Sequence, residues 1–196
     1  MTIVITGWRS AIAEEFRRLL RSNEEIVHGK PMEPNFPLGA ERYLFCQGLL
    51  RPKRIEDQTD AEIREGIEVN FASIVRACDL IFATNVLARV CVIGSESGYR
   101  GSFDENYASA KELLHAYVEK KRLSQLQQLV AISPGIIGDC RMTTSRTDVE
   151  NLIRRREEHP KRRFLEASEV AAMARTLLYF QPYISGTIIR MHGGLH

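Results

Sequence analysis

The segment NYASAKELLHAYVEKK, residues 106–121, contains two pairs in which a lysine follows a tyrosine by four positions. The pairs are Tyr107 with Lys111 and Tyr117 with Lys121. The segment has the pattern of a helix, and residues four apart lie on the same helical face. A nearby ammonium stabilises a phenolate, so a tyrosine with an ordinary pKa of about 10 can become useful in proton transfer. Each pair could therefore carry chemistry, or could be a surface feature.

Position along the helix separates the two pairs. Tyr107 falls in the first turn of the predicted helix and follows Ser95 by twelve residues. Tyr117 lies roughly 15 Å further along the axis, at about 1.5 Å per residue. The residues twelve and thirteen before it are Glu105 and Asp104, which are not serines. We therefore expect the first pair to be functional and the second to be a surface feature.

The elements that position these residues follow from alternating apolar and helical patterns. Six apolar runs predict strands: TIVITG (2–7), EIVHG (25–29), RYLFCQG (42–48), ARVCVIGS (88–95), LQQLVAISPG (126–135) and SGTIIRMHGG (185–194). Helical patterns between them cover residues 10–22, 59–85, 106–121 and 166–181. This alternation predicts an α/β fold with a doubly wound, Rossmann-like parallel sheet in three α/β/α layers. Ligands of such sheets bind beyond the carboxyl ends of the strands.

Composition limits the class of protein. With 196 residues, 44% hydrophobic and 27% charged, the chain reads as a single soluble domain over residues 1–196. A net charge of +2 gives no electrostatic footprint for nucleic acid. The opening MTIVITG passes directly into a strand, and no apolar run is long enough for a membrane span, so we expect a cytoplasmic protein.

The cysteines have neither C-x-x-C spacing nor companion histidines, so we expect no metal site. Cys46 and Cys91 fall inside strand-like runs and are expected to be buried free thiols.

Several short motifs occur near the predicted strand ends. They are TGWRSAIA (6–13), EVNFAS (68–73), VCVIGSESG (90–98), ISPGIIG (132–138) and HGG (192–194). None is strong alone, but their order and spacing, together with the first Tyr-x-x-x-Lys pair, resemble the classical branch of the short-chain dehydrogenase/reductase family. The resemblance runs from Thr2 to Gly194. It implies an NAD(P)H-dependent oxidoreductase that interconverts a carbonyl and an alcohol by hydride transfer.

The resemblance assigns four catalytic positions. Tyr107 would be the general acid/base, and Lys111 would bind the nicotinamide ribose and lower the pKa of the tyrosine. Ser95 would orient the substrate oxygen. Asn70 would anchor a water relay behind the lysine, although an asparagine in a helix is often a surface residue.

The resemblance also implies cofactor contacts. They are expected at Gly7, Arg9, Ser10, Ala11, Ile12, Lys30, Gly48, Tyr107, Lys111, Pro134, Gly135 and Ile137. The backbone of Ile137 would meet the nicotinamide carboxamide. The end of the second strand, VHGKP, has no acidic residue for a ribose 2′-hydroxyl, whereas Lys30 and Arg9 could bind a 2′-phosphate. We therefore expect NADP in preference to NAD.

The chain departs from the family pattern in several places. The last two glycines of the family's T-G-x-x-x-G-x-G loop are Ala11 and Ala13, and the methyl of Ala11 would crowd a pyrophosphate. Residues 30–41 hold three prolines and a glycine and leave no room for the usual helix and strand, so one edge strand should be lost. The family's N-N-A-G is FCQG here, which keeps only Gly48. Asp139 replaces the usual threonine and is given no role.

The basic run RRREEHPKRR, residues 154–163, lies in a predicted substrate loop around residues 139–165. Such a run is either a solvated helix end or a site for an anionic substrate. His115 and His159 have no partner in the sequence and are expected to be solvated. Gly193 and Gly194 either end a strand or belong to a cofactor loop.

The expected partner is a small carbonyl or alcohol, and the family resemblance favours a homodimer or homotetramer paired through the Asn70 and Tyr107 helices. Two alternatives stay open: a homologue that binds nucleotide without catalysis, and a sugar-nucleotide epimerase or dehydratase of the extended branch. The short C-terminal part disfavours the latter.

Overall fold

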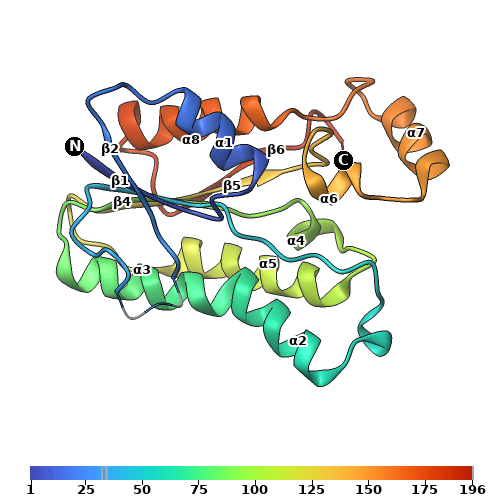
Figure 1. The fold of residues 1–196 in the computed structure, drawn as a ribbon, viewed down its shortest axis with the longest axis horizontal. Helices are drawn as coiled ribbons and strands as arrows, with labels where there is room; N and C mark the ends of the chain where they lie inside the picture. Colours follow the sequence, from blue (N-terminus) through green and yellow to red (C-terminus); the bar gives the residue numbers. More distant parts are fainter. Residues whose placement is uncertain (32, 34, 196) are drawn as a thin grey trace.

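Within the described residues, six strands form one parallel sheet between two layers of helices (Figure 1). The computed structural model describes residues 1–31, 33 and 35–195. The strands are β1 (Thr2–Thr6), β2 (Glu25–His28), β3 (Arg42–Phe45), β4 (Arg89–Ile93), β5 (Gln128–Pro134) and β6 (Thr187–Met191). Their order is β2-β1-β3-β4-β5-β6, and each neighbouring pair is parallel. The predicted doubly wound sheet is confirmed.

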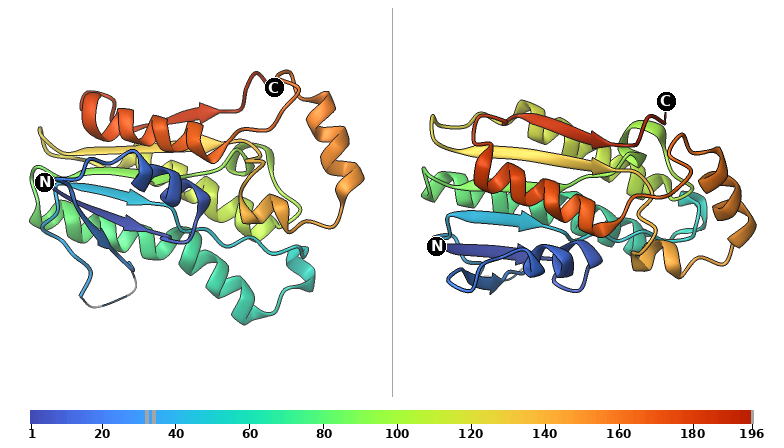
Figure 2. Two further views of the ribbon diagram at one scale, coloured as in Figure 1. Left: turned by 45° about the horizontal axis from the view of Figure 1, so that its top comes forward. Right: turned by 90° about the horizontal axis from the view of Figure 1, so that it is seen from above.

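Helices cover both faces of the sheet (Figures 1 and 2). On one face lie α1 (Ala11–Arg18) and α8 (Ala167–Phe180). On the other lie α3 (Ser73–Thr84) and α5 (Glu105–Lys120). The remaining helical elements are η1 (Ile55–Asp57), α2 (Asp60–Ile67), the π-helical turn η2 (Glu68–Ala72), α4 (Ser97–Arg100), α6 (Arg141–Thr144) and α7 (Val149–Glu158). Figure 1 shows α2, α6 and α7 toward the carboxyl ends of the strands.

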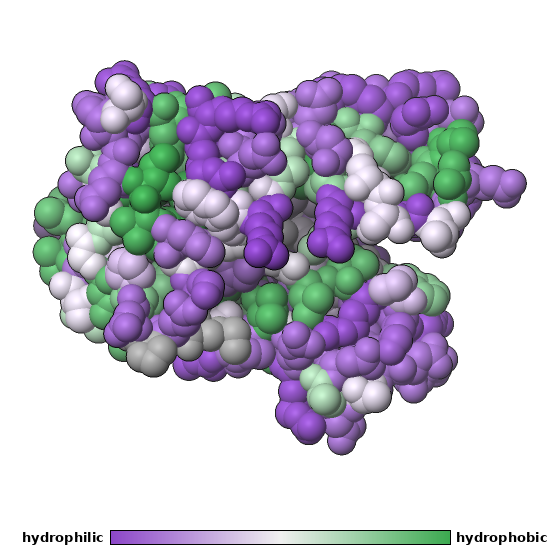
Figure 3. Space-filling view, in the orientation of Figure 1, coloured by the Kyte–Doolittle hydropathy of each residue, from purple (hydrophilic) through white to green (hydrophobic). Residues whose placement is uncertain are grey.

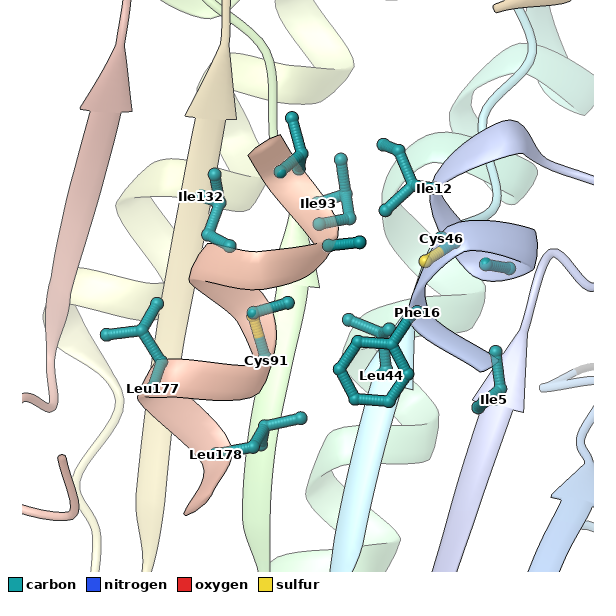
Figure 4. Close-up of a cluster of buried hydrophobic side chains, with 14 of the residues drawn as sticks. Ile5, Ile12, Phe16, Leu44, Cys46, Cys91, Ile93, Ile132, Leu177 and Leu178 are labelled. Carbon is teal, nitrogen blue, oxygen red and sulfur yellow. The ribbon is translucent and has the colours of Figure 1, made fainter. Parts of the chain in front are cut away.

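Alternation of side chains along each strand produces two apolar layers. Ile3 and Ile5 of β1 face α1 and α8, whereas Val4 between them faces α3 and α5. Phe16 of α1 and Leu177 of α8 point into the first layer (Figure 4). Because these strands are buried on both faces, they read as continuous apolar runs in the sequence. Full burial of each large apolar side chain contributes about 1.5–3 kcal/mol.

The chain between β2 and β3 is shorter than a helix–strand unit would require. Its described residues form no helix or strand, in agreement with the predicted loss of an edge strand. Phe36 from this segment is buried, and a Cβ on Gly29 would lie 2.7 Å from its ring and 2.5 Å from Val4. The predicted proline-rich segment also includes Met32 and Pro34, which lie outside the described residues.

The predicted long helix over residues 59–85 consists of α2, η2 and α3 in succession. Thr59 caps it, since its hydroxyl accepts from Glu62 N at 3.2 Å and Thr59 N donates to the Glu62 carboxylate at 2.9 Å. Together these two bonds form a capping box. The π-helical turn interrupts the α-helical pattern at Asn70, and such turns frequently mark functional positions.

The predicted burial of Cys46 and Cys91 is confirmed, and Cys78 is also buried, while Cys140 is partly exposed. Among the residues that the structure describes, no three His, Cys, Asp or Glu side chains are grouped so that they could hold a metal. Over the same residues, none of the helices is both long and apolar enough to cross a membrane.

Candidate active site

Tyr107 and Ser95 meet at the carboxyl end of the sheet. Asp104 caps α5, because its Oδ1 accepts from Tyr107 N at 3.1 Å, and this bond fixes Tyr107 in the first helical turn. The side chain of Ser95, which follows β4, lies beside the phenol and acts to lower the pKa of Tyr107. Ser95 Oγ also accepts from Ser97 N at 3.1 Å. The hydroxyl and the phenol are therefore held together in the protein.

Lys111 lies one helical turn from Tyr107 and is 1% exposed. Its Nζ donates to the Ile93 carbonyl at 2.8 Å and lies 5.7 Å from the centroid of the Tyr107 ring. Burial lowers the pKa of Lys111 to about 8. The side chain is therefore a buried cation at pH 7, close to its point of titration.

The pKa of Tyr107 moves opposite to the expectation. Burial raises the pKa of Tyr107 to about 12, and the bond to Ser95 opposes this rise. Lys111 is not among the groups that shift the pKa of Tyr107, and its ammonium donates to the Ile93 carbonyl. Tyr107 is therefore a neutral phenol at pH 7, which is the protonation state that a proton donor requires.

The second pair, Tyr117 and Lys121, contacts a neighbouring helix. Tyr117 Oη and Lys121 Nζ contact the same oxygen of Asp79, at 2.6 and 2.7 Å. Burial, with the adjacent Asp79 carboxylate, raises the pKa of Tyr117. Asp79 belongs to α3, so the pair ties α5 to its neighbouring helix. This arrangement agrees with the expectation that the second pair is not catalytic.

Asn70 lies in η2 and is completely buried, so a surface role is wrong. Its Nδ2 donates to the carbonyls of Leu49 and Gly66 at 2.7 and 2.9 Å, and its Oδ1 accepts from Leu49 N at 2.9 Å. The side chain thus fastens the segment after β3 to the long helix. Its part in a water relay stays a prediction.

Gly7 shapes the turn between β1 and α1. Its φ of +62° lies in the left-handed region. A Cβ on Gly7 would lie 2.5 Å from the Cys46 carbonyl carbon and 2.5 Å from Gln47 N. Only glycine lets these two strand ends approach so closely. The turn is thereby placed against the end of β3.

The N-terminus of α1 follows this turn. Ser10 N donates to the Gly7 carbonyl at 2.8 Å, and Ser10 Oγ accepts from Ala13 N at 3.1 Å. These bonds leave the N–H groups of Ala11 and Ile12 without an acceptor among the described residues. Free N–H groups at a helix N-terminus suit a phosphate.

The Gly7 turn and the N-terminus of α1 together form a cradle for phosphate. The end of β3 adds an unsatisfied hydrogen-bond donor to this cradle. Gln47 accepts from the Thr6 hydroxyl, and its Nε2 is buried with no partner among the described groups. A Cβ on Gly48 would lie 3.2 Å from Met142 of α6, so α6 lies across this strand end. A buried donor without an acceptor costs about 1–3 kcal/mol. The free donors around Gly7 and Gln47 therefore fit the phosphates and hydroxyls of a dinucleotide.

Beyond β5, Pro134 ends the strand and Gly135 N donates to β6 at 3.0 Å. Ile137 forms a parallel bridge with Leu165, which closes the segment carrying α6 and α7. The bonds of this bridge use the neighbours of Ile137, so its own N–H points away from Leu165. Asp139, expected to have no role, accepts from the first N–H of α8 at 2.9 Å.

The residues expected to determine the preference for NADP over NAD lie at and near the end of β2. Lys30 Nζ forms an ion pair with Glu33 at 2.6 Å. Arg9 is exposed in the neighbouring turn. The rings of Trp8 and His28 lie 5.2 Å apart at the same place. The strand end itself holds no carboxylate, but Glu33 reaches Lys30 from the following segment.

The basic run lies on α7 and the chain after it. Arg155 and Arg156 are exposed. His159, expected to be solvated, is half-buried, and a Cβ on Gly193 would lie 2.7 Å from its ring. Figure 3 shows a hollow in the surface between the parts formed by α7 and α2. The run therefore stands at one side of the hollow.

Three structural features escaped prediction. The Asp104 cap carried a recognisable signal, an aspartate three residues before Tyr107 at a helix start. Glu96, directly after Ser95, is 6% exposed and pairs with Arg190, a contact that no local pattern indicates. The prediction that His115 is solvated is wrong, because its side chain is 4% exposed. Its position one turn after Lys111 on the inward helix face could have predicted this burial.

No protein-family model matches the sequence, and neither does any curated protein. Solved structures do match. A short-chain dehydrogenase/reductase from Brucella melitensis has a TM-score of 0.85 at 17% identity, covering 100% of this chain and 96% of that one. A short chain dehydrogenase family protein from Francisella tularensis has a TM-score of 0.82 at 15% identity, covering 98% and 97%. An actinorhodin polyketide ketoreductase with NADPH has a TM-score of 0.83 at 16% identity, covering 99% and 96%.

These likenesses extend over the whole chain, from the Gly7 turn to the end of β6. At 15–17% identity they concern the fold, which here is a six-stranded parallel sheet with helices on both faces. The chain therefore has the Rossmann-like fold of short-chain dehydrogenase/reductase structures.

Proposed function

We propose that this protein is an oxidoreductase that interconverts a carbonyl and an alcohol with a nicotinamide dinucleotide. The observation that carries the proposal is the grouping of Ser95, Tyr107 and Lys111. A serine hydroxyl contacts a buried phenol, and a buried ammonium lies one helical turn away. The fold shared with dehydrogenase and reductase structures supports the same conclusion.

The three side chains would have different roles in the proton transfer. Tyr107 holds a proton on Oη and would deliver it to the substrate oxygen, with Ser95 orienting that oxygen by a hydrogen bond. The Lys111 ammonium would stabilise the phenolate that this transfer leaves behind. When bound, a reduced nicotinamide supplies the hydride. Tyr107 is protonated at pH 7, which is the form that a proton donor in carbonyl reduction requires.

The cofactor would be held at the cradle described above. Its pyrophosphate would lie at the free N–H groups of Ala11 and Ile12, and its ribose hydroxyls near Gln47 and Lys111. Lys30 and Arg9 at the edge favour a 2′-phosphate, so we propose NADP(H) in preference to NAD(H).

Two measurements test the proposal. NADPH fluorescence should rise on titration with the protein and approach saturation. A panel of ketones and aldehydes should include at least one compound that the protein reduces with consumption of NADPH. Binding without turnover of any carbonyl or alcohol would contradict the oxidoreductase assignment.

A non-catalytic nucleotide-binding protein is the second candidate. Ala11 stands where the related loops have glycine, and Met142 lies against Gly48 across a strand end. Both features narrow the cradle. Under this candidate, NADPH would bind and thermally stabilise the protein, and Tyr107→Phe would change neither binding nor any measured turnover.

The proposed substrate is a small carbonyl compound, and the exposed Arg155 and Arg156 favour one that carries an anionic group. We also propose a homo-oligomer paired through α3 and α5, where Leu80 and Leu113 are 55% and 49% exposed. Sedimentation of the protein and of Leu113→Glu tests this pairing. A wild-type monomer at micromolar concentration would contradict it.

A further inference from the structure

His115 occupies the same face of α5 as the two proposed catalytic residues. It follows Tyr107 by eight positions and Lys111 by four. All three side chains are buried, at 7%, 1% and 4% exposure. A buried histidine on this face must have a partner or perturb the site.

The partner is the loop that carries Ser95. Ser95 N donates to His115 Nε2 at 3.4 Å. A Cβ on Gly94 would lie 2.3 Å from Nε2, and one on Gly98 would lie 2.9 Å from the imidazole Cε1. Glycines on both sides of the loop therefore make room for the ring. The imidazole of His115 fills the space beside the loop that carries Ser95, the residue whose hydroxyl contacts Tyr107.

Tyr99 and Arg190 complete the surroundings. The Tyr99 ring of α4 stacks on His115 with centroids 4.7 Å apart, and the Arg190 guanidinium of β6 lies 4.3 Å from the Tyr99 centroid. Arg190 Nε donates to Glu96 at 3.0 Å, and Glu96 also accepts from the Ser133 hydroxyl. These contacts hold the imidazole of His115 between its own helix, α5, and the loop that carries Ser95.

Burial and two neighbouring cations favour the neutral form of the His115 ring. Burial, together with the Lys111 ammonium on α5, lowers the pKa of His115 to about 4. Glu96 before α4 acts in the opposite direction, and Arg190 on β6 acts with Lys111. A neutral imidazole that accepts at Nε2 carries its proton on Nδ1. Protonation at Nε2 would remove the acceptor of the Ser95 amide.

We propose that His115 is a positioning residue of the active site, which holds the Ser95 loop, and so the Ser95 hydroxyl, against Tyr107. It acts through Ser95 and touches no reacting atom. The inference rests on the proposed function for its catalytic consequence, but its structural part can be measured without a substrate.

The structural part is tested by NMR on the histidine-labelled protein without substrate. The His115 ring should stay neutral from pH 8 to pH 5, with the proton on Nδ1, and the Ser95 amide should be protected from exchange. An asparagine amide ends near the Nδ1 position, whereas a glutamine amide reaches the Nε2 position. Exchange of the Ser95 amide should therefore be about tenfold faster in His115→Asn and nearly unchanged in His115→Gln. A ring that titrates near pH 6.5, or equal exchange in the two variants, would overturn the proposal.

The catalytic part uses the same two variants. His115→Asn should lower kcat for carbonyl reduction about tenfold, while the Kd for NADPH stays within about twofold, and His115→Gln should recover most of the rate. Equal kcat values for both variants and the wild type would overturn the positioning role. If the wild type reduces no carbonyl compound, the proposed function fails, and the ring titration and amide exchange still decide whether His115 holds the loop.

Discussion

Replacing Lys111 by methionine should make the fold more stable as it removes activity. Methionine keeps a similar length and apolar stem but carries no charge. In the folded protein the pKa of Lys111 falls from 10.5 to about 8, and this difference corresponds to about 3 kcal/mol. Loss of the bond to the Ile93 carbonyl costs about 1–3 kcal/mol in return. The net effect at pH 7 should be a gain of about 1 kcal/mol.

The pH dependence is a sharper test than the net value. Below pH 8 the lysine is protonated in both the folded and unfolded states, so its burial penalty is fully present. Between pH 8 and pH 10.5 the unfolded chain binds more protons than the folded protein, and wild-type stability therefore rises with pH. From pH 7 to pH 9.5 this rise should be about 2 kcal/mol relative to Lys111→Met.

Thermal unfolding without cofactor, at pH 7 and pH 9.5, measures the effect. Raising the pH from 7 to 9.5 should raise the Tm of the wild type by about 4–8 °C relative to the Tm of Lys111→Met. The matched control is Lys121→Met, which removes a lysine of the same helical region that binds Asp79 at the surface. Its stability relative to wild type should change by less than about 0.5 kcal/mol over the same pH range. Stability curves that run parallel for Lys111→Met and the wild type would refute the reasoning.

Two further predictions concern ligands at the edges of the site. Glu33→Gln frees Lys30 from its ion pair, so the Kd for NADPH should fall severalfold with little change for NADH; tighter NADH than NADPH binding by the wild type would contradict the cofactor preference. If Arg155 and Arg156 bind an anionic substrate, KM should rise with salt, because exposed charges are screened over about 10 Å at 0.1 M. Neutralising both should raise KM more than it lowers kcat, and a salt-independent KM would leave α7 as a solvated helix.

The sheet could be predicted from sequence because its strands are buried on both faces. Runs such as TIVIT and RVCVI keep their apolar character without alternation, and glycine or proline residues separate them from the helices. The Thr59 capping box and the glycine at the Gly7 turn are local features that short motifs in a sequence can indicate. Spacing also placed Tyr107 in the first turn of α5 and Tyr117 further along it, because distance along a helix is fixed by residue number.

What could not be predicted depends on contacts between distant segments. Glu96 and Arg190 are 94 residues apart and meet only because β4 and β6 flank β5. Glu33 reaches Lys30 through an irregular segment that has no periodicity to read. The pKa of Tyr107 depends on burial and on the neighbouring Ser95 side chain, neither of which follows from a four-residue spacing.

The central claim is that Tyr107 is the proton donor of a carbonyl reductase. The most direct test compares Tyr107→Phe with Tyr117→Phe in steady-state NADPH oxidation, using a carbonyl compound that the wild type reduces. Phenylalanine keeps each ring and its packing and removes only the hydroxyl. Tyr107→Phe should lower kcat by about 10²–10⁴-fold with little change in the Kd for NADPH, whereas Tyr117→Phe should stay within about threefold of wild type, because its hydroxyl serves only a contact with Asp79. Wild-type turnover by Tyr107→Phe would contradict the account.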